Sequence, residues 1–256
     1  MRESYFHRLQ TKTTSPSGEL FVFAAILLAC NLPLAGDRVA ESMVFMPDRV
    51  MAGEWWRILS HPFVHITWYH LLLDAGAFLL LYGGIGEPSR LKRVAYVAIC
   101  GMGSLGVSML ASPVVHERGL CGLSGIAHGL MAVSALELAA KDSLAGRSCR
   151  AGMITFGIVV AKSVMEVLSG HVLFESLHFG MMGLPIPESH AGGVLSGIAA
   201  FLVLHSSSRS KRGRALLNRH MESARCQNPI PHPGHGKRKL AAPWNSIGST
   251  QSRWSL

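Results

Sequence analysis

Charged residues are scarce in this chain. Only 15% of its 256 residues are Asp, Glu, Lys or Arg, whereas an average soluble domain has about a quarter. The charges also avoid several long apolar stretches, and the mean hydropathy is +0.30. This scarcity argues against a soluble fold, and a hydrophobic content of 49% excludes a disordered chain.

Cysteine is scarce as well, and the 27 glycines are scattered without a collagen-like period. The five cysteines form no CxxC pair and no other spacing typical of a metal site: Cys30, Cys100, Cys121, Cys149 and Cys226. We therefore expect no disulfide framework and no metal, and we interpret these residues as small buried hydrophobes.

Acidic residues are almost absent from the C-terminal segment. Residues 206–256 contain ten Lys or Arg and one acid, Glu222, while the first 205 residues contain fourteen of each sign. The net charge of +9 therefore belongs to this tail, and a nucleic-acid-binding surface is not implied. We predict a disordered cytoplasmic tail that fixes topology, with contact to anionic lipid as a side effect.

Apolar stretches suited to crossing a membrane are what the sequence does contain. Because backbone groups in lipid must be hydrogen-bonded internally, such stretches form helices. We predict an all-α membrane protein, with a cytoplasmic segment 1–19 and a six-helix membrane domain over 20–205. The first stretch lacks a small-x-small cleavage site, so we expect a retained helix rather than a signal peptide. The six stretches are 20–35, 64–82, 94–110, 123–140, 151–168 and 190–204.

Lys and Arg residues set the predicted orientation. Nineteen lie in the N-terminal segment, the second-to-third and fourth-to-fifth connections and the tail, against four in the other connections. The positive-inside rule then places both termini in the cytoplasm. The second, fourth and sixth helices therefore begin at the exterior face.

Ionisable residues inside a membrane are costly and mark functional sites. Four of them lie in the outer halves of the second, fourth and sixth helices: His70, Asp74, His128 and His190. Lys162 and Glu166, four residues apart on the fifth helix, are interpreted as a structural ion pair. The convergence of the first four predicts a site near the exterior face.

Ser124 lies at the exterior end of the fourth helix, in Gly122-Leu123-Ser124-Gly125. Alone it would be a helix cap. A flexible glycine turn and free N–H groups at a helix start also suit a nucleophile whose substrate develops an oxyanion. His70 and Asp74, four residues apart on the second helix, can complete an oxyanion pocket with Gly122 and the Ser124 N–H.

Small residues predict that the fourth and sixth helices pack closely. Gly193 and Gly197 lie on the helical face below His190, and Gly125 and Gly129 follow Ser124. Packing of these faces would bring His190 within reach of Ser124 as a general base. No third acid is expected to orient His190, so the prediction is a Ser–His dyad. His128, one turn below Ser124, is either a rival base or a packing residue.

Together these motifs resemble the rhomboid family of intramembrane serine proteases. Glu54-Trp55-Trp56-Arg57 is similar to the family's ExWR signature, in which Glu54, Trp56 and Arg57 are structural. His70 to Asp74 resemble HxxxN, Gly122 to Gly125 resemble GxSG, and His190 to Gly197 resemble HxxGxxxG. The resemblance implies a six-helix bundle, a Ser124 nucleophile, a His190 base, no cofactor, and transmembrane protein substrates.

Two details qualify the resemblance. Asp74 stands where the family has asparagine, so it is either a protonated donor or a carboxylate paired with His70 or an arginine. His128, one turn after the nucleophile, resembles the rhombosortase branch, which implies bacterial inner-membrane cleavage of Gly-rich C-terminal sorting anchors.

Other functions fit less well. A metalloprotease would need HExxH, an aspartyl protease needs a second intramembrane aspartate, and a transporter of inverted repeats needs paired halves. The main alternative is a catalytically inactive rhomboid-like protein that binds membrane clients. The presence of both Ser124 and His190 argues against it, and Asp74 argues mildly for it.

Overall fold

The structure, a computed structural model, describes residues 16–141, 147–173, 181 and 183–205. The chain divides into two units, residues 1–209 and 210–256. The second unit lies outside the described residues, and so do the predicted cytoplasmic tail and most of the predicted N-terminal segment.

The described residues are helical, with one isolated β-bridge between Phe45 and Leu120. The all-helical prediction is therefore confirmed for this part of the chain. A further helix covers residues 187–205. The other elements are α1 (Ser17–Cys30), η2 (Leu32–Gly36), η3 (Glu41–Met43), α2 (Pro47–Met51), α3 (Arg57–Ser60), η4 (His61–Phe63), α4 (Trp68–Gly84), α5 (Arg90–Ala111), α6 (Pro113–Arg118), α7 (Ser124–Ala139) and α8 (Arg147–Ser169).

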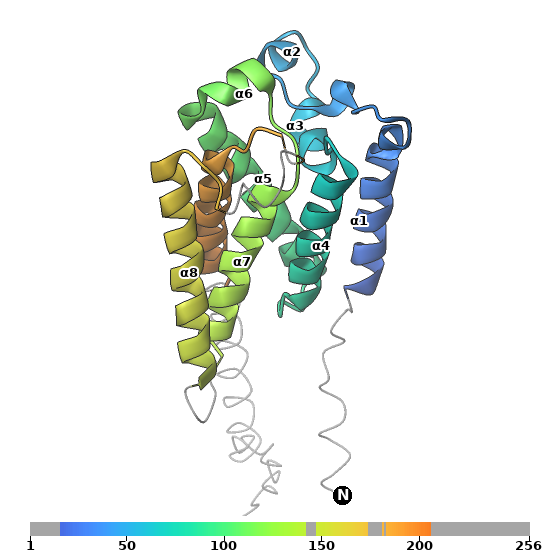
Figure 1. Ribbon diagram of the computed structural model, residues 1–256. Helices are drawn as coiled ribbons and strands as arrows, with labels where there is room; N and C mark the ends of the chain where they lie inside the picture. The colour runs from blue at the N-terminus through green and yellow to red at the C-terminus, as the bar shows by residue number, and fades with distance from the viewer. Residues whose placement is uncertain (1–15, 142–146, 174–180, 182, 206–256) are drawn as a thin grey trace, which may run out of the picture. The chain divides into compact units, whose positions relative to one another are not determined.

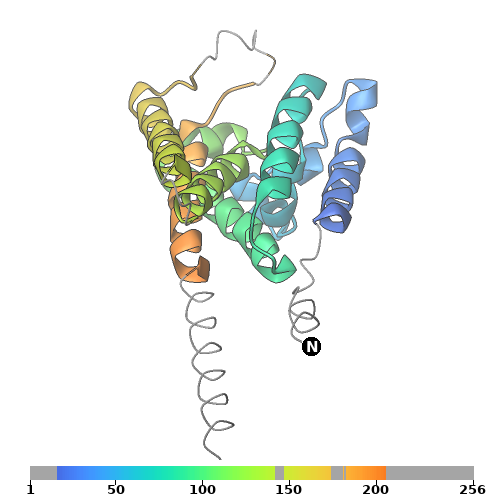
Figure 2. The same ribbon diagram turned by 90° about the horizontal axis from the view of Figure 1, so that it is seen from below.

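Helix α7 is the centre of this arrangement (Figure 1). It packs against α8, α4 and α5, and α1 packs on the other side of α4, as the view from below also shows (Figure 2). The core between these helices is apolar and aromatic, with Phe78, Tyr82, Tyr96, Leu130 and Phe201 all buried. Helix α7 is therefore held in place by three neighbouring helices.

The outward faces of the helices are apolar. Phe21 on α1 is 76% exposed, Leu110 on α5 is 90% exposed, and Leu168 on α8 is 82% exposed. Apolar surface on this scale is unfavourable in water and suits a lipid environment.

Three described stretches are long and apolar enough to cross a membrane: Ser17–Gly36, Arg90–Ala111 and Arg147–Ser169. A fourth is added if Arg57–Phe63 and Trp68–Gly84, bent by 95°, are one broken span. Helix α7 is apolar but shorter. The number of six spans therefore stays a prediction.

A buried ion pair joins three helices at the end of the bundle away from Ser124. Arg93 on α5 donates through Nη2 to Glu19 Oε1 of α1 at 2.7 Å and through Nε to Oε2 at 3.0 Å. The hydroxyl of Tyr82 on α4 also donates to Glu19. A bidentate arginine–carboxylate pair fixes geometry as well as charge, so it holds α1, α4 and α5 in register.

Candidate functional site

Ser124 begins α7 directly after a tight turn. Gly122 has a φ of +99°, a conformation that residues with a Cβ rarely adopt, and its N–H donates to the His61 carbonyl at 3.1 Å. A Cβ at Gly122 would also lie 3.0 Å from Asp74 Oδ2 and from His70 Nε2. Both backbone conformation and space therefore require glycine two residues before Ser124.

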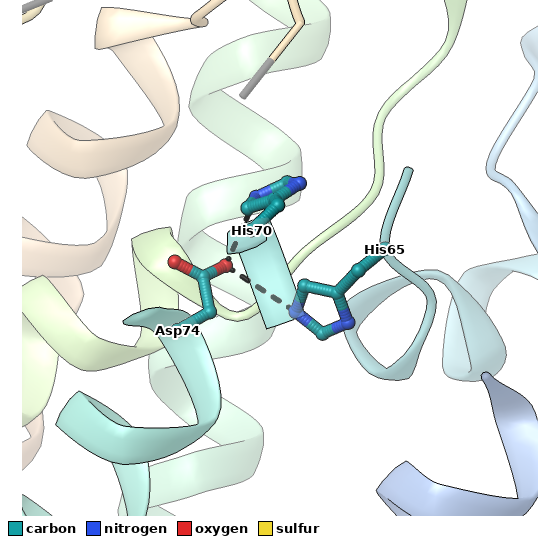
Figure 3. A group of neighbouring side chains, drawn as sticks. All are labelled: His65, His70 and Asp74. Carbon is teal, nitrogen blue, oxygen red and sulfur yellow. Dashed lines mark ion pairs between the residues drawn. The ribbon is translucent and has the colours of Figure 1, made fainter. Parts of the chain in front are cut away.

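The predicted oxyanion residues lie beside this turn, and His65 joins them (Figure 3). Asp74 Oδ2 lies 3.3 Å from His70 Nε2 and 3.4 Å from His65 Nε2. The same oxygen accepts the Leu123 N–H at 2.8 Å. The Leu123 N–H donates a hydrogen bond to Oδ2, and two imidazole nitrogens lie within ion-pair distance of the same oxygen, which favours a carboxylate at Asp74 over a protonated acid.

The glycine faces of α7 and the helix 187–205 are in contact. A Cβ added at Gly193 would overlap the Gly125 carbonyl oxygen, and one at Gly129 would lie 2.7 Å from the Gly193 oxygen. At Gly197, a Cβ would lie 2.5 Å from the Gly129 carbonyl oxygen. The two backbones therefore touch along a seam, hereafter the glycine seam, formed by Gly125, Gly129, Gly193 and Gly197.

The glycine seam brings His190 and His128 together. The two rings stack in parallel, with centroids 3.8 Å apart and an interplanar angle of 13°. His128 lies one turn after Ser124 on α7, so His190 is positioned beside the start of that helix. Among the described residues, no hydrogen bond joins the Ser124 hydroxyl to His190. Such bonds commonly tighten only when substrate binds.

Both ring nitrogens of His128 are engaged. Nδ1 lies 2.7 Å from the Ser124 carbonyl oxygen, which can only accept, so Nδ1 carries the proton. Nε2 lies 2.7 Å from the Lys162 ammonium, which can only donate, so Nε2 is the acceptor. These bonds require a neutral His128 of one tautomer.

An acid does lie beside His190, contrary to the prediction that none would be placed to orient it. Its Nδ1 lies 2.8 Å from Oε2 of Glu166, which is fully buried on α8. The other oxygen, Oε1, accepts from Lys162 at 2.5 Å and from the Leu173 N–H at 3.0 Å. The predicted Lys162–Glu166 pair exists, and Glu166 also contacts His190.

Sequence reasoning missed Glu166, Lys162 and His65. Glu166 had a signal, because it lies in the outer half of its predicted span, as do His70 and His190. The lysine at i−4, Lys162, is a sufficient local explanation for Glu166, so the sequence alone does not single it out. His65 lies outside the described helices, in the segment between η4 and α4, and no helical spacing links it to Asp74.

The ExWR residues support the loop above the site. Arg57 is buried and binds Glu54 at 2.5 Å, and its Nη1 donates to the Glu41 and Val44 carbonyls at 2.6 Å each. Trp56 donates from its indole to the Ser42 carbonyl at 2.9 Å. Together they tie residues 41–44 to the segment that leads into α4.

Two groups of side chains have ligand atoms within 4.8 Å of one another and could hold a metal ion. They are His65, His70 and Asp74, and His128, Glu166 and His190. In both groups the carboxylate already has nitrogen-bearing partners within the protein, so its negative charge does not require a bound metal ion as a partner. The expectation of no metal stays a prediction.

Comparison with known proteins agrees with the motifs. Residues 52–207 match the family model of the Rhomboid domain. The chain is also similar to the rhomboid protease GlpG of Salmonella choleraesuis (strain SC-B67), with 23% identity over 190 residues, covering 72% of this chain and 61% of that protein. Since the family match covers more than half of the chain and contains Ser124 and His190, the chain belongs to the rhomboid family.

Proposed function

We propose that the protein is a serine endopeptidase that cleaves transmembrane protein substrates, with Ser124 as nucleophile and His190 as general base. The observation that carries this proposal is the glycine seam, which sets His190 against the helix that Ser124 begins. A nucleophile next to a base on a facing rigid element is the arrangement that acyl transfer requires.

The hydrogen bonds favour His190 over His128 as the base. His128 uses Nδ1 on the Ser124 carbonyl and Nε2 on Lys162, so neither nitrogen is open to the Ser124 hydroxyl proton. His190 uses Nδ1 on Glu166, which leaves the Nε2 lone pair for that proton. After attack, the same nitrogen returns the proton to the leaving amine.

The turn before α7 supports an oxyanion pocket. The Ser124 N–H is at a helix start, where backbone donors lack helical partners. Asp74 holds the adjacent Leu123 N–H and lies beside His70. In this proposal Asp74 acts as an acceptor that fixes the turn and His70. The donors to the oxyanion are the Ser124 N–H and, when the His70 ring is protonated beside Asp74, its Nδ1, which has no hydrogen-bond partner among the described residues.

The length of α7 supports cleavage inside the membrane. Its 16 residues extend about 24 Å, less than the ~30 Å hydrocarbon core of a bilayer. With one end of α7 near the cytoplasmic face, Ser124 would lie below the exterior surface. We propose a multi-pass protein with six spans in the bacterial inner membrane and both termini cytoplasmic.

We further propose the rhombosortase-like role, removal of Gly-rich C-terminal anchors from exported proteins. Carbonyls in a substrate helix are hydrogen-bonded, so the helix must unwind before Ser124 can reach one. Glycine lowers that cost, being about 1 kcal/mol worse than alanine in a helix interior. The contact of His128 with the Ser124 carbonyl supports a specific role for His128, the residue on which the resemblance to the rhombosortase branch depends.

Fluorophosphonate labelling tests the proposal, with Ser124→Ala as the matched variant. We expect the wild-type protein to be labelled and to cleave a single-span substrate in liposomes, and Ser124→Ala to do neither. Equal cleavage by both proteins would overturn the assignment of Ser124. A folded wild type without labelling or cleavage would favour the inactive rhomboid-like alternative. Exported proteins compared in cells with and without Ser124 would test the Gly-rich anchor.

A further inference from the structure

We propose that Glu166 is a positioning residue that orients His190 and stabilises its protonated ring, so the site operates as a Ser124–His190–Glu166 triad. This inference rests on the proposed protease function and deepens it. The family resemblance implies only a serine and a histidine, and Glu166 comes from α8, a helix that carries none of the family motifs.

Burial is the first argument. Glu166 is 0% exposed and His190 is 6% exposed, so their contact of 2.8 Å is largely shielded from water. An ionised carboxylate is costly in such a place unless it is paired and hydrogen-bonded. Lys162 and the Leu173 N–H, both on Oε1, supply that compensation.

The two carboxylate oxygens of Glu166 have different partners, and this is the second argument. A structural ion pair would be complete with Lys162 on Oε1. Instead Oε2 is directed to Nδ1 of His190, a nitrogen that must then carry its proton, because a carboxylate only accepts. This fixes the tautomer in which Nε2 is the basic nitrogen.

The charges around His190 are the third argument. Glu166 and Lys162 face it from α8, and the neutral His128 ring stacks on it from α7. At rest the cluster is neutral overall. When Nε2 takes the Ser124 proton, the Ser124 oxygen bonds to the substrate carbonyl carbon and the C=O π pair moves onto the carbonyl oxygen, which becomes the oxyanion. The imidazolium formed in this step gains Glu166 as a counter-charge. Lys162 also holds His128 neutral, so the stacked ring adds no repulsion.

The decisive experiment measures kcat, KM and the pH profile of cleavage for Glu166→Gln, Lys162→Met and the double variant. We expect Glu166→Gln to lower kcat by about 100-fold or more, with KM changed by less than about threefold. In this variant the positive charge of Lys162 remains and the negative charge of Glu166 is gone, which disfavours protonation of His190. The acidic limb of the kcat/KM profile should therefore move to lower pH. In Lys162→Met the negative charge of Glu166 remains without the lysine, which favours protonation of His190, so the acidic limb should move to higher pH.

The double variant is the control for a loss of activity caused by misfolding. It contains no buried charge at these positions, and replacement of a buried pair by uncharged groups is often neutral or stabilising. We expect a thermal midpoint at or above that of the wild type, with kcat still about 100-fold low. Wild-type kcat in the double variant, or acidic limbs that do not move apart in the single variants, would overturn the triad while Ser124-dependent cleavage survived. Ser124-independent cleavage by the wild type would instead overturn the protease function and the triad with it.

Discussion

His128 and His190 lie in parallel at a centroid distance of 3.8 Å, yet their hydrogen bonds give them different chemistry. His128 donates to a backbone carbonyl and accepts from an ammonium group, whereas His190 faces a carboxylate. The hydrogen bonds of His128 therefore require a neutral ring, whereas His190 has an acidic partner.

Histidine substitutions should separate these two functions. We expect His190→Ala to abolish both substrate cleavage and fluorophosphonate labelling of Ser124. His128→Ala should retain labelling and reduce cleavage only partially, because it removes a stacking partner rather than the base. Loss of labelling in a folded His128→Ala protein, with labelling kept in His190→Ala, would reverse the assignment of the base.

The glycine seam should be intolerant of one methyl group. Gly193→Ala would force the new Cβ into the Gly125 carbonyl oxygen, so α7 and the helix 187–205 must separate. We expect a drop in stability of at least about 1–3 kcal/mol and loss of cleavage, measured by thermal unfolding and peptide cleavage. The control is Gly106→Ala on α5, where a Cβ meets nothing within 4 Å. Equal effects of the two substitutions would mean that the seam is not closely packed.

Asp74 should be replaceable by its amide but not by alanine. Asp74→Asn keeps an oxygen for the Leu123 N–H, so we expect a folded protein whose cleavage rate stays within about tenfold of the wild type. Asp74→Ala leaves that buried N–H without its acceptor, at a cost of about 1–3 kcal/mol of unfolding free energy. An inactive but stable Asn variant would instead show that the negative charge at Asp74 is required.

Cys121 should resist alkylation in the folded protein. Burial and the nearby Asp74 carboxylate raise the pKa of the Cys121 thiol to about 12. Because the thiolate is the reactive form, only a very small fraction of Cys121 would be reactive at pH 8.5, and its reactivity should rise with pH. Cys149 at the start of α8 is the internal control, because it is exposed and the interpretation of it as a buried hydrophobe was wrong. Mass spectrometry after maleimide treatment would measure both, and equal modification at pH 8.5 would contradict the structure around Gly122.

Periodic and local signals in the sequence were sufficient for much of the fold. Apolar stretches predicted the helices, and the glycine spacing predicted which faces of α7 and the helix 187–205 meet, as they do here. The stretch predicted over 64–82 becomes a helix only from Trp68, where the Thr67 side chain accepts the His70 N–H as an N-cap. A hydropathy pattern does not register that capping contact.

The contacts of Glu166 were beyond local reasoning for a physical reason. The i,i+4 spacing to Lys162 is visible in the sequence, but the contact with His190 depends on how α8 packs beside α7 and the helix 187–205. A charge that is satisfied locally gives no indication that one of its oxygens is directed elsewhere. Each buried acid near a predicted site is therefore worth testing for a second partner.

The glycine seam has a consequence for motion. Glycine has no rotamers, so the interface between α7 and the helix 187–205 cannot relax by side-chain repacking. Any change in the spacing between the Ser124 and His190 backbones must therefore move one helix relative to the other. We expect a ligand that binds between these helices to tilt one of them, and repacking of side chains elsewhere to leave this backbone spacing unchanged.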